Sequence, residues 1–143
     1  MTSPTRLFLG FSLVAFAGCA TFNLAEVPFA LGQQQFGPGD AIVIEHVRSS
    51  SPDWAIGDTV EIQGQYVLAS QRAAMLSVYM TTRSPGSSTS SDGGGRKEVA
   101  LGSGRFDLTY QIQATGELHV SFYPVGGGSS FGGVYFGPDV SKP

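Results

Sequence analysis

Residues 59–68, Thr-Val-Glu-Ile-Gln-Gly-Gln-Tyr-Val-Leu, alternate apolar and polar side chains at almost every position. Successive side chains of a β-strand point to opposite faces of a sheet, so this period of two predicts a strand with one buried side. Gly64 interrupts the buried row, which indicates a bulge or a close approach of another backbone. The buried row otherwise consists of Val60, Ile62, Tyr66 and Leu68.

The same alternation recurs on both sides of this stretch and predicts an all-β domain. No segment shows a convincing amphipathic helix, and about seven short strands separated by turns are typical of an antiparallel β-sandwich, immunoglobulin-like in the loose sense. A small closed barrel is the alternative. The expected strands are residues 41–48, 59–68, 74–80, 97–101, 106–112, 117–123 and 131–136.

The segments between the strands carry turn residues. We expect a turn at 70–72, a break at 102–104, and a connection at 49–57 in which Trp54 and Ile56 point inward. Residues 84–95 contain no apolar side chain larger than proline, so they are expected to form a flexible Ser/Gly loop.

The composition limits the possible partners. The chain has 143 residues, of which 13% are charged, and its formal net charge is −3 with no basic run. An acidic chain without a Lys/Arg stripe is a poor binder of phosphate backbones, so no nucleic-acid partner is expected.

The first eighteen residues have the form of a signal peptide. Arg6 precedes an apolar stretch, residues 7–18, that is too short to span a bilayer as a helix. The stretch ends in Phe16-Ala17-Gly18-Cys19, which resembles the lipobox of bacterial lipoproteins. That resemblance implies cleavage before Cys19 and a lipid on its thiol; cleavage after Ala17, giving a soluble exported protein, is the alternative.

The resemblance also implies a location and a domain plan. Ala20, rather than Asp, follows the cysteine, which under the lipoprotein sorting rule favours the outer membrane over the inner membrane. We therefore expect a signal peptide at 1–18, a lipid-anchored lead-in or tether at 19–39, and the β-sandwich domain at 40–138. The lead-in is expected to be a tether or an irregular segment with a turn at 36–39, and its apolar residues make packing of part of it on the domain the alternative.

Four stretches of the mature chain support a second resemblance. They are residues 57–70, 102–108, 119–124 and 132–136. Together they resemble a small all-β domain of exported proteins from planctomycete-type environmental bacteria, over about residues 41–137. That family has no assigned activity, so the resemblance implies a shared β fold and transfers no catalytic residue.

Few residues are candidates for catalysis or for metal binding. The chain has two histidines, and the pair that best fits a Ser-His nucleophile is His119 with Ser121, two positions apart on one strand. Gly-x-Ser-x-Gly is absent, and the single cysteine lies in the export segment, so we expect no catalytic set, no metal site and no cofactor.

A binding surface is the remaining candidate. His119, Ser121 and Tyr123 share one outward side of their strand, and Tyr135 is expected to join them. Such side chains on an exposed sheet face suit a glycan or a peptide. The interpretation that the sequence favours is that the other sheet, the lead-in or a loop covers this face, which would make these residues structural. The sequence therefore predicts a non-enzymatic, membrane-tethered interaction or structural protein of the cell envelope. An envelope hydrolase using His119 and Ser121, or an accessory subunit of an outer-membrane complex, is the alternative.

Overall fold

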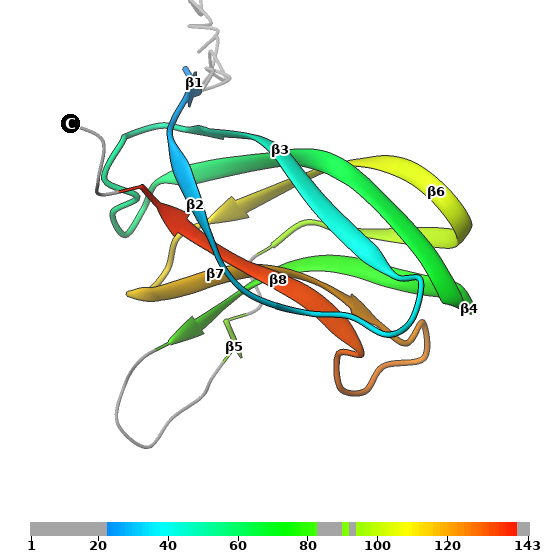
Figure 1. The fold of residues 1–143 in the computed structure, drawn as a ribbon. Coiled ribbons are helices and arrows are strands. Elements are labelled where there is room, and N and C mark those ends of the chain that lie inside the picture. The colour runs from blue at the N-terminus through cyan, green and yellow to red at the C-terminus, as the bar shows by residue number, and fades with distance from the viewer. Residues whose placement is uncertain (1–22, 83–89, 92–93, 140–143) are drawn as a thin grey trace, which may run out of the picture.

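A computed structural model describes residues 23–82, 90–91 and 94–139. The signal peptide and Cys19 lie outside these residues. All regular elements of the described chain are β-strands (Figure 1): β1 (Ala25–Glu26), β2 (Phe29–Gln35), β3 (Ala41–Ser49), β4 (Thr59–Thr82), β5 (Ser90–Ser91), β6 (Arg96–Gln111), β7 (Gly116–Tyr123) and β8 (Gly132–Pro138).

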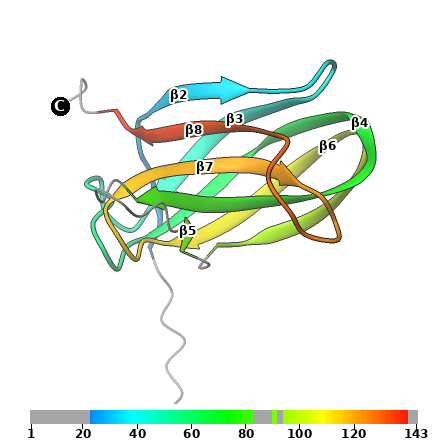
Figure 2. The same cartoon turned by 90° about the horizontal axis from the view of Figure 1, so that it is seen from below.

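The strands form one antiparallel sheet that curls on itself into a half-barrel (Figures 1 and 2). The order is β1-β3-β4-β7-β8-β2, and β5 and β6 both pair with β4. The first half of β4 pairs with β3, and its second half pairs with β7, so one strand belongs to both layers. The predicted all-β, sandwich-like fold is confirmed.

The expected turn at 70–72 is wrong, because β4 continues through it to Thr82. A register shift against β6 between Leu68 and Ala73 absorbs the extra residues as a bulge. The buried carboxylate of Asp40 holds this bulge by accepting hydrogen bonds from the Ala69 N–H (2.8 Å), the Ser70 N–H (3.0 Å) and the Ser70 hydroxyl (2.6 Å). The polar residues thus bend the strand without ending it.

The expected break at 102–104 is also wrong, since β6 runs from Arg96 to Gln111. Gly102 has a φ of +112°, a conformation that side-chain-bearing residues rarely adopt. It lies opposite Leu68 at the bulge of β4. The glycine therefore lets β6 follow the bend of its partner strand.

From Asn23 onward, the lead-in packs on the domain as strands of the sheet and is not irregular. Residues 25–26 pair with the end of β3, and residues 29–35 form β2, which pairs with β8 along the sheet edge. Every β2 side chain after Phe29 is exposed, so the strand shows no apolar alternation, and backbone hydrogen bonds hold it. The predicted turn at 36–39 is confirmed by the hydrogen bond from Asp40 N to Gly37 O (3.1 Å).

Part of the expected Ser/Gly loop is also paired. Ser90–Ser91 pair with Met80 and Thr81 of β4, and Gly94 bridges to Tyr110. A Cβ on Gly94 would lie 2.1 Å from the Val78 carbonyl oxygen, so the glycine allows a close backbone contact that needs no apolar side chain. Residues 84–89 and 92–93 of this stretch lie outside the described chain.

The core fills the inner face of the curled sheet. The predicted inward rows of residues 60–68, 74–80, 106–112 and 118–122 are buried there, with Tyr66 half-buried. Trp54 is buried, as predicted, and meets Phe136 edge-on at 5.8 Å between ring centroids. Ile56, expected to point inward, is instead 67% exposed at the tip of its loop, because the Asp58 carboxylate turns the loop back by accepting from Ala55 N (2.7 Å).

Gly64 makes the close approach that the sequence indicated. A Cβ at this position would lie 2.0 Å from the Val43 carbonyl oxygen and 2.9 Å from the Phe106 ring. The neighbouring register shift lies on β3, between Ile44 and His46.

Candidate functional site

Aromatic side chains cross the outer face of β4, β7 and β8 in one row. The strand register sets Tyr79 opposite His119, and His119 opposite Tyr135. The ring centroids are 6.1 Å apart for Tyr79 and His119 and 4.9 Å apart for His119 and Tyr135. Because directly opposed residues in an antiparallel sheet share a face, these three rings form a continuous ridge across the strands.

A row of small residues lies beside this ridge. Ser77, Ser121 and Gly133 are opposed to one another on β4, β7 and β8, and Gln35 of β2 continues the row to the sheet edge. A Cβ on Gly133 would lie 2.0 Å from the Ser121 hydroxyl oxygen, so the glycine is what makes room for that hydroxyl. The result is a trough between taller side chains.

Tyr123 crosses the trough. Its hydroxyl lies 3.2 Å from Nε2 of His119 and also hydrogen bonds Ser121. Its ring meets Tyr79 edge-on at 5.2 Å between centroids. Burial, together with the neighbouring Tyr79 and Tyr135, raises the pKa of Tyr123 to about 12, against the smaller opposing effect of the Ser121 hydrogen bond. Tyr123 is therefore a neutral hydrogen-bonding bridge over Ser121.

His119 is held in its neutral form. Its side chain is only 7% exposed although it is on the outer face, because the surrounding tyrosines cover it. Burial lowers the pKa of His119 to about 4, and no charged group contributes to that shift. Its two ring nitrogens meet hydroxyl oxygens: Nε2 faces Tyr123, and Nδ1 lies 3.4 Å from the Thr81 hydroxyl.

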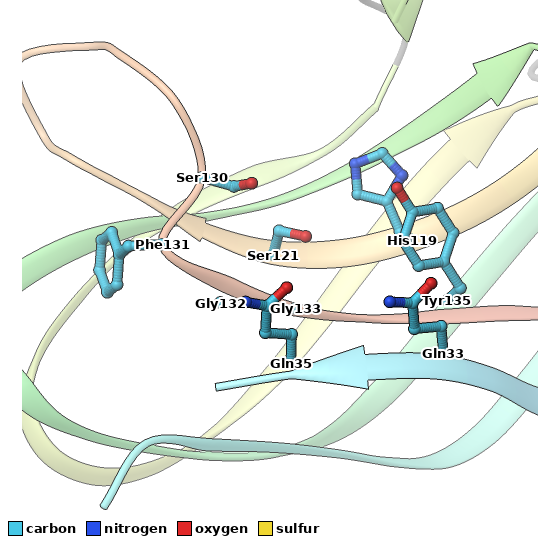
Figure 3. A pocket seen from close by; sticks show the side chains of 9 residues that line it. All are labelled: Gln33, Gln35, His119, Ser121, Ser130, Phe131, Gly132, Gly133 and Tyr135. Atoms are coloured by element: carbon cyan, nitrogen blue, oxygen red, sulfur yellow. The ribbon is translucent and has the colours of Figure 1, made fainter. Parts of the chain in front are cut away.

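A hollow of about 370 Å³ opens over β7, β8 and β2 (Figure 3). Glycines 132 and 133 and Phe131 line it together with hydroxyl, amide and imidazole groups. Figure 3 shows Gln33 beside Tyr135 and Gln35 toward Ser121, both extending from β2. The polar lining residues are Gln33, Gln35, His119, Ser121, Ser130 and Tyr135, and none of them carries a charge at neutral pH.

A second hollow of about 430 Å³ opens over β4 and β7. Met75, Ser77 and Tyr79 of β4 line it with Tyr123 and the β7–β8 connection. That connection borders both hollows, since Ser130 lines the first and Val125 lines the second. We refer to the side chains between and around the hollows as the outer patch: Ser77, Tyr79, Thr81, His119, Ser121, Tyr123 and Tyr135.

The structure brings together the four surface residues that the sequence singled out. His119, Ser121 and Tyr123 share the outer face of β7, and the Tyr135 ring of β8 packs against His119 at an interplanar angle of 41°. Sequence reasoning missed Ser77, Tyr79 and Thr81, although their outward positions alternate with the inward row at 74–80. It also missed Gln33 and Gln35, because β2 carries no strand pattern.

The arrangement of Ser121 and His119 differs from a nucleophile and its base. The Tyr123 hydroxyl lies 3.2 Å from Nε2 of His119 and also hydrogen bonds Ser121, so the partner of each residue is Tyr123. A pKa of about 4 also makes the imidazole a weak proton acceptor, whereas a general base works best with a pKa near the working pH. Both ring nitrogens of His119 are instead engaged by the hydroxyl groups of Tyr123 and Thr81.

Comparison with family models, curated proteins and solved structures gives no match. Within the described residues no helix is long and apolar enough to cross a membrane. In the same part of the chain, no group of three or more His, Cys, Asp and Glu side chains is placed to hold a metal ion.

Proposed function

We propose that this protein is a non-enzymatic binding module of the cell envelope, exported and tethered to a membrane through a lipid on Cys19. The observation that carries the binding role is the outer patch with its first hollow. It combines neighbouring aromatic rings with uncharged donors and acceptors on a solvent-facing side of the sheet. Sites of this kind fix the orientation of a ligand by a few placed polar groups.

The position of the hollow suits a tethered protein. The described chain starts at Asn23, and Phe29 of β2 lies at the Pro138 end of β8, whereas Gln35 lies at the Gly133 end beside the hollow. Six residues of extended strand separate these two ends of β2, or about 20 Å. A domain anchored through its N-terminal side would thus hold the hollow at its far end.

The tether would be short. Four residue spacings separate Cys19 from Asn23, which fully extended chain covers in about 14 Å. A lipid on Cys19 would therefore keep the domain close to the membrane, and by the sorting rule this is the outer membrane rather than the inner one. Two or more acyl chains suffice for stable anchoring.

The binding role is tested with a glycan array and with pull-down from envelope extracts, using the mature chain. We expect a retained ligand whose binding is lost in Tyr135→Ala, which removes one wall of the first hollow. Gln63→Ala, a matched truncation on the other outward half of β4, should bind like the original. The binding role would be contradicted if the original protein bound nothing in both assays, or if Tyr135→Ala bound the ligand as well as the original protein does.

The anchor is tested separately by growing cells with labelled palmitate. The proposal expects label on the original protein and none on Cys19→Ser, with Cys19→Ser released from the membrane fraction. An unlabelled original protein that fractionates like Cys19→Ser would overturn the anchor and leave the binding role standing.

A further inference from the structure

We infer that the ligand of the outer patch is a neutral oligosaccharide that lies across the strands and occupies both hollows. This inference rests on the proposed binding role and specifies its ligand. It follows from the shape of the trough, from the bridge that Tyr123 makes over it, and from the uncharged lining of the first hollow.

The trough runs perpendicular to the strands. Its floor is the row of Ser77, Ser121 and Gly133, with Gln35 at the β2 edge. This row crosses β2, β8, β7 and β4, which are separated by three intervals of about 4.8 Å, or roughly 14 Å in all, and Arg96 of β6 lies beyond Ser77 at its end. That length exceeds one sugar ring and suits a short chain of sugars.

Tyr123 divides the trough without closing it. Tyr123 lines the second hollow, and its hydroxyl reaches Nε2 of His119, which lines the first hollow together with Ser121. A chain that fills both hollows must cross this bridge, so the Tyr123 hydroxyl would contact its middle. The β7–β8 connection borders both hollows and forms a common rim, in which Gly127 and Gly128 have φ values of +89° and +130°.

The lining favours a neutral, hydroxyl-rich ligand. Two primary amides and two serine hydroxyls each present both donors and acceptors in the first hollow, and His119 stays uncharged. A phosphate or carboxylate group would gain no cationic partner there. Arg96 lines only the second hollow, where it already takes part in another interaction.

A peptide fits these observations less well. Extended peptides commonly add to the free edge of a sheet through main-chain hydrogen bonds. The first hollow reaches the edge strand β2, but it is lined there by the side chains of Gln33 and Gln35, and over β7 the main-chain groups are already paired with β4 and β8. Side-chain amides and hydroxyls are the groups left to recognise a ligand.

The test measures affinity against ligand length with the full mature chain. Glucose oligomers of one to six residues, in α-1,4 and β-1,4 linkage, are titrated by calorimetry. In one of these series we expect affinity to rise at least tenfold between the disaccharide and the tetrasaccharide and then level off. Gln35→Ala should weaken every length that binds, because it removes a group of the first hollow.

The second hollow is tested with Met75→Ala, which should weaken the tetrasaccharide about fivefold and leave the disaccharide unchanged. Gln63→Ala serves as the control and should change neither. Equal affinity for all lengths, or equal weakening of all lengths by Met75→Ala, would overturn the two-hollow arrangement and leave the binding role intact. If no neutral oligomer binds and a peptide or protein is captured at the patch instead, the ligand class is overturned. If no ligand of any kind binds, the proposed function is overturned as well.

Discussion

The two halves of β4 present outward faces of opposite character. The first half carries Glu61, Gln63 and Gln65, which take part in a network of ion pairs and hydrogen bonds. Arg48 forms an ion pair with Glu61 at 3.2 Å, and the Gln63 amide donates a hydrogen bond to Asp107 at 2.9 Å. Arg105 and Gln65 both reach Glu45 across the same face. The second half carries Ser77, Tyr79 and Thr81, which join the aromatic outer patch.

The difference shows what each face is suited to. Charged side chains on the first face stay hydrated and pair with one another, as charged side chains on most protein surfaces do. The second face keeps a histidine almost fully buried and neutral among tyrosines, and no strand of the described residues covers it. Aromatic and uncharged polar side chains concentrated on an outward face are typical of a binding surface, because they exchange contact with water for contact with a ligand at little desolvation cost.

The largest expected loss of stability follows from a substitution on the inner side of β7. The effects of substitutions on the two outward faces are compared with it. Phe122 is fully buried and stacks on Phe131 at 5.8 Å. Phe122→Ala should therefore lower the free energy of unfolding by about 3–5 kcal/mol, measured by chemical denaturation. Ser121→Ala, one residue away on the patch, should cost no more than about 1 kcal/mol; similar costs for the two variants would mean that the sides of β7 are wrongly assigned.

The next effect is a pH dependence caused by His119. Its folded pKa of about 4 lies below the ordinary 6.5, so the unfolded chain binds the extra proton first as the pH falls. The stability is complete above pH 6.5 and declines as the pH falls toward 4, by on the order of 3 kcal/mol.

Denaturant unfolding between pH 7 and pH 4 checks this slope. His119→Gln should flatten it, while His46→Gln, on the charged side of the sheet, should leave it in place. A slope that survives His119→Gln would show that another group causes it and would contradict a His119 pKa lowered by burial.

A smaller effect comes from Asp40, which holds the bend between the two halves of β4. Burial would raise the pKa of Asp40, but the hydrogen bonds from Ser70 and from the Ala69 and Ser70 N–H groups outweigh it and lower the pKa below 3.8. Asp40→Ala should cost about 2 kcal/mol, because three hydrogen bonds to a buried carboxylate are lost.

The Asp40 contribution should be present above pH 3.8 and disappear as the pH falls through the lowered folded pKa. The difference in unfolding free energy between original and Asp40→Ala should therefore narrow between pH 5 and pH 2. A constant difference over that range would show that the carboxylate charge does not hold the bulge.

The smallest effect is expected on the charged face. Glu45→Gln removes an exposed pair with Arg105 (2.6 Å) and should change stability by less than about 1 kcal/mol. Added salt should shrink even that difference, since exposed pairs are screened. If Glu45→Gln lowered the free energy of unfolding as much as Phe122→Ala, the charged face could not be an exposed surface whose pairs contribute little to stability.

The sequence predicted what depends on side-chain alternation. The all-β class, the inner rows of β4, β6 and β7, and the shared outward side of His119, Ser121 and Tyr123 all follow from a period of two. Gly64 was predicted to meet another backbone, and it does so at Val43.

What the sequence did not predict depends on the backbone and on distant partners. The turn expected at 70–72 is a bulge, because Asp40, about thirty residues away, satisfies its N–H groups. The side chains of β2 are exposed on both faces, so the strand shows no alternation of apolar and polar residues. The sequence around Gln33 and Gln35 therefore did not indicate that β2 pairs with β8. The burial of His119 required knowing that Tyr79 and Tyr135 lie on either side of it.

The most direct test of the account is a chemical-shift titration of the isotopically labelled mature chain with the oligosaccharide series. We predict that the largest shifts fall on Gln35, Ser121, Gly133 and Tyr135, while Glu61, Gln63 and Asp107 on the other half of the sheet stay unchanged. Shifts confined to the charged half, or spread evenly over both halves, would contradict the assignment of the outer patch as the binding surface.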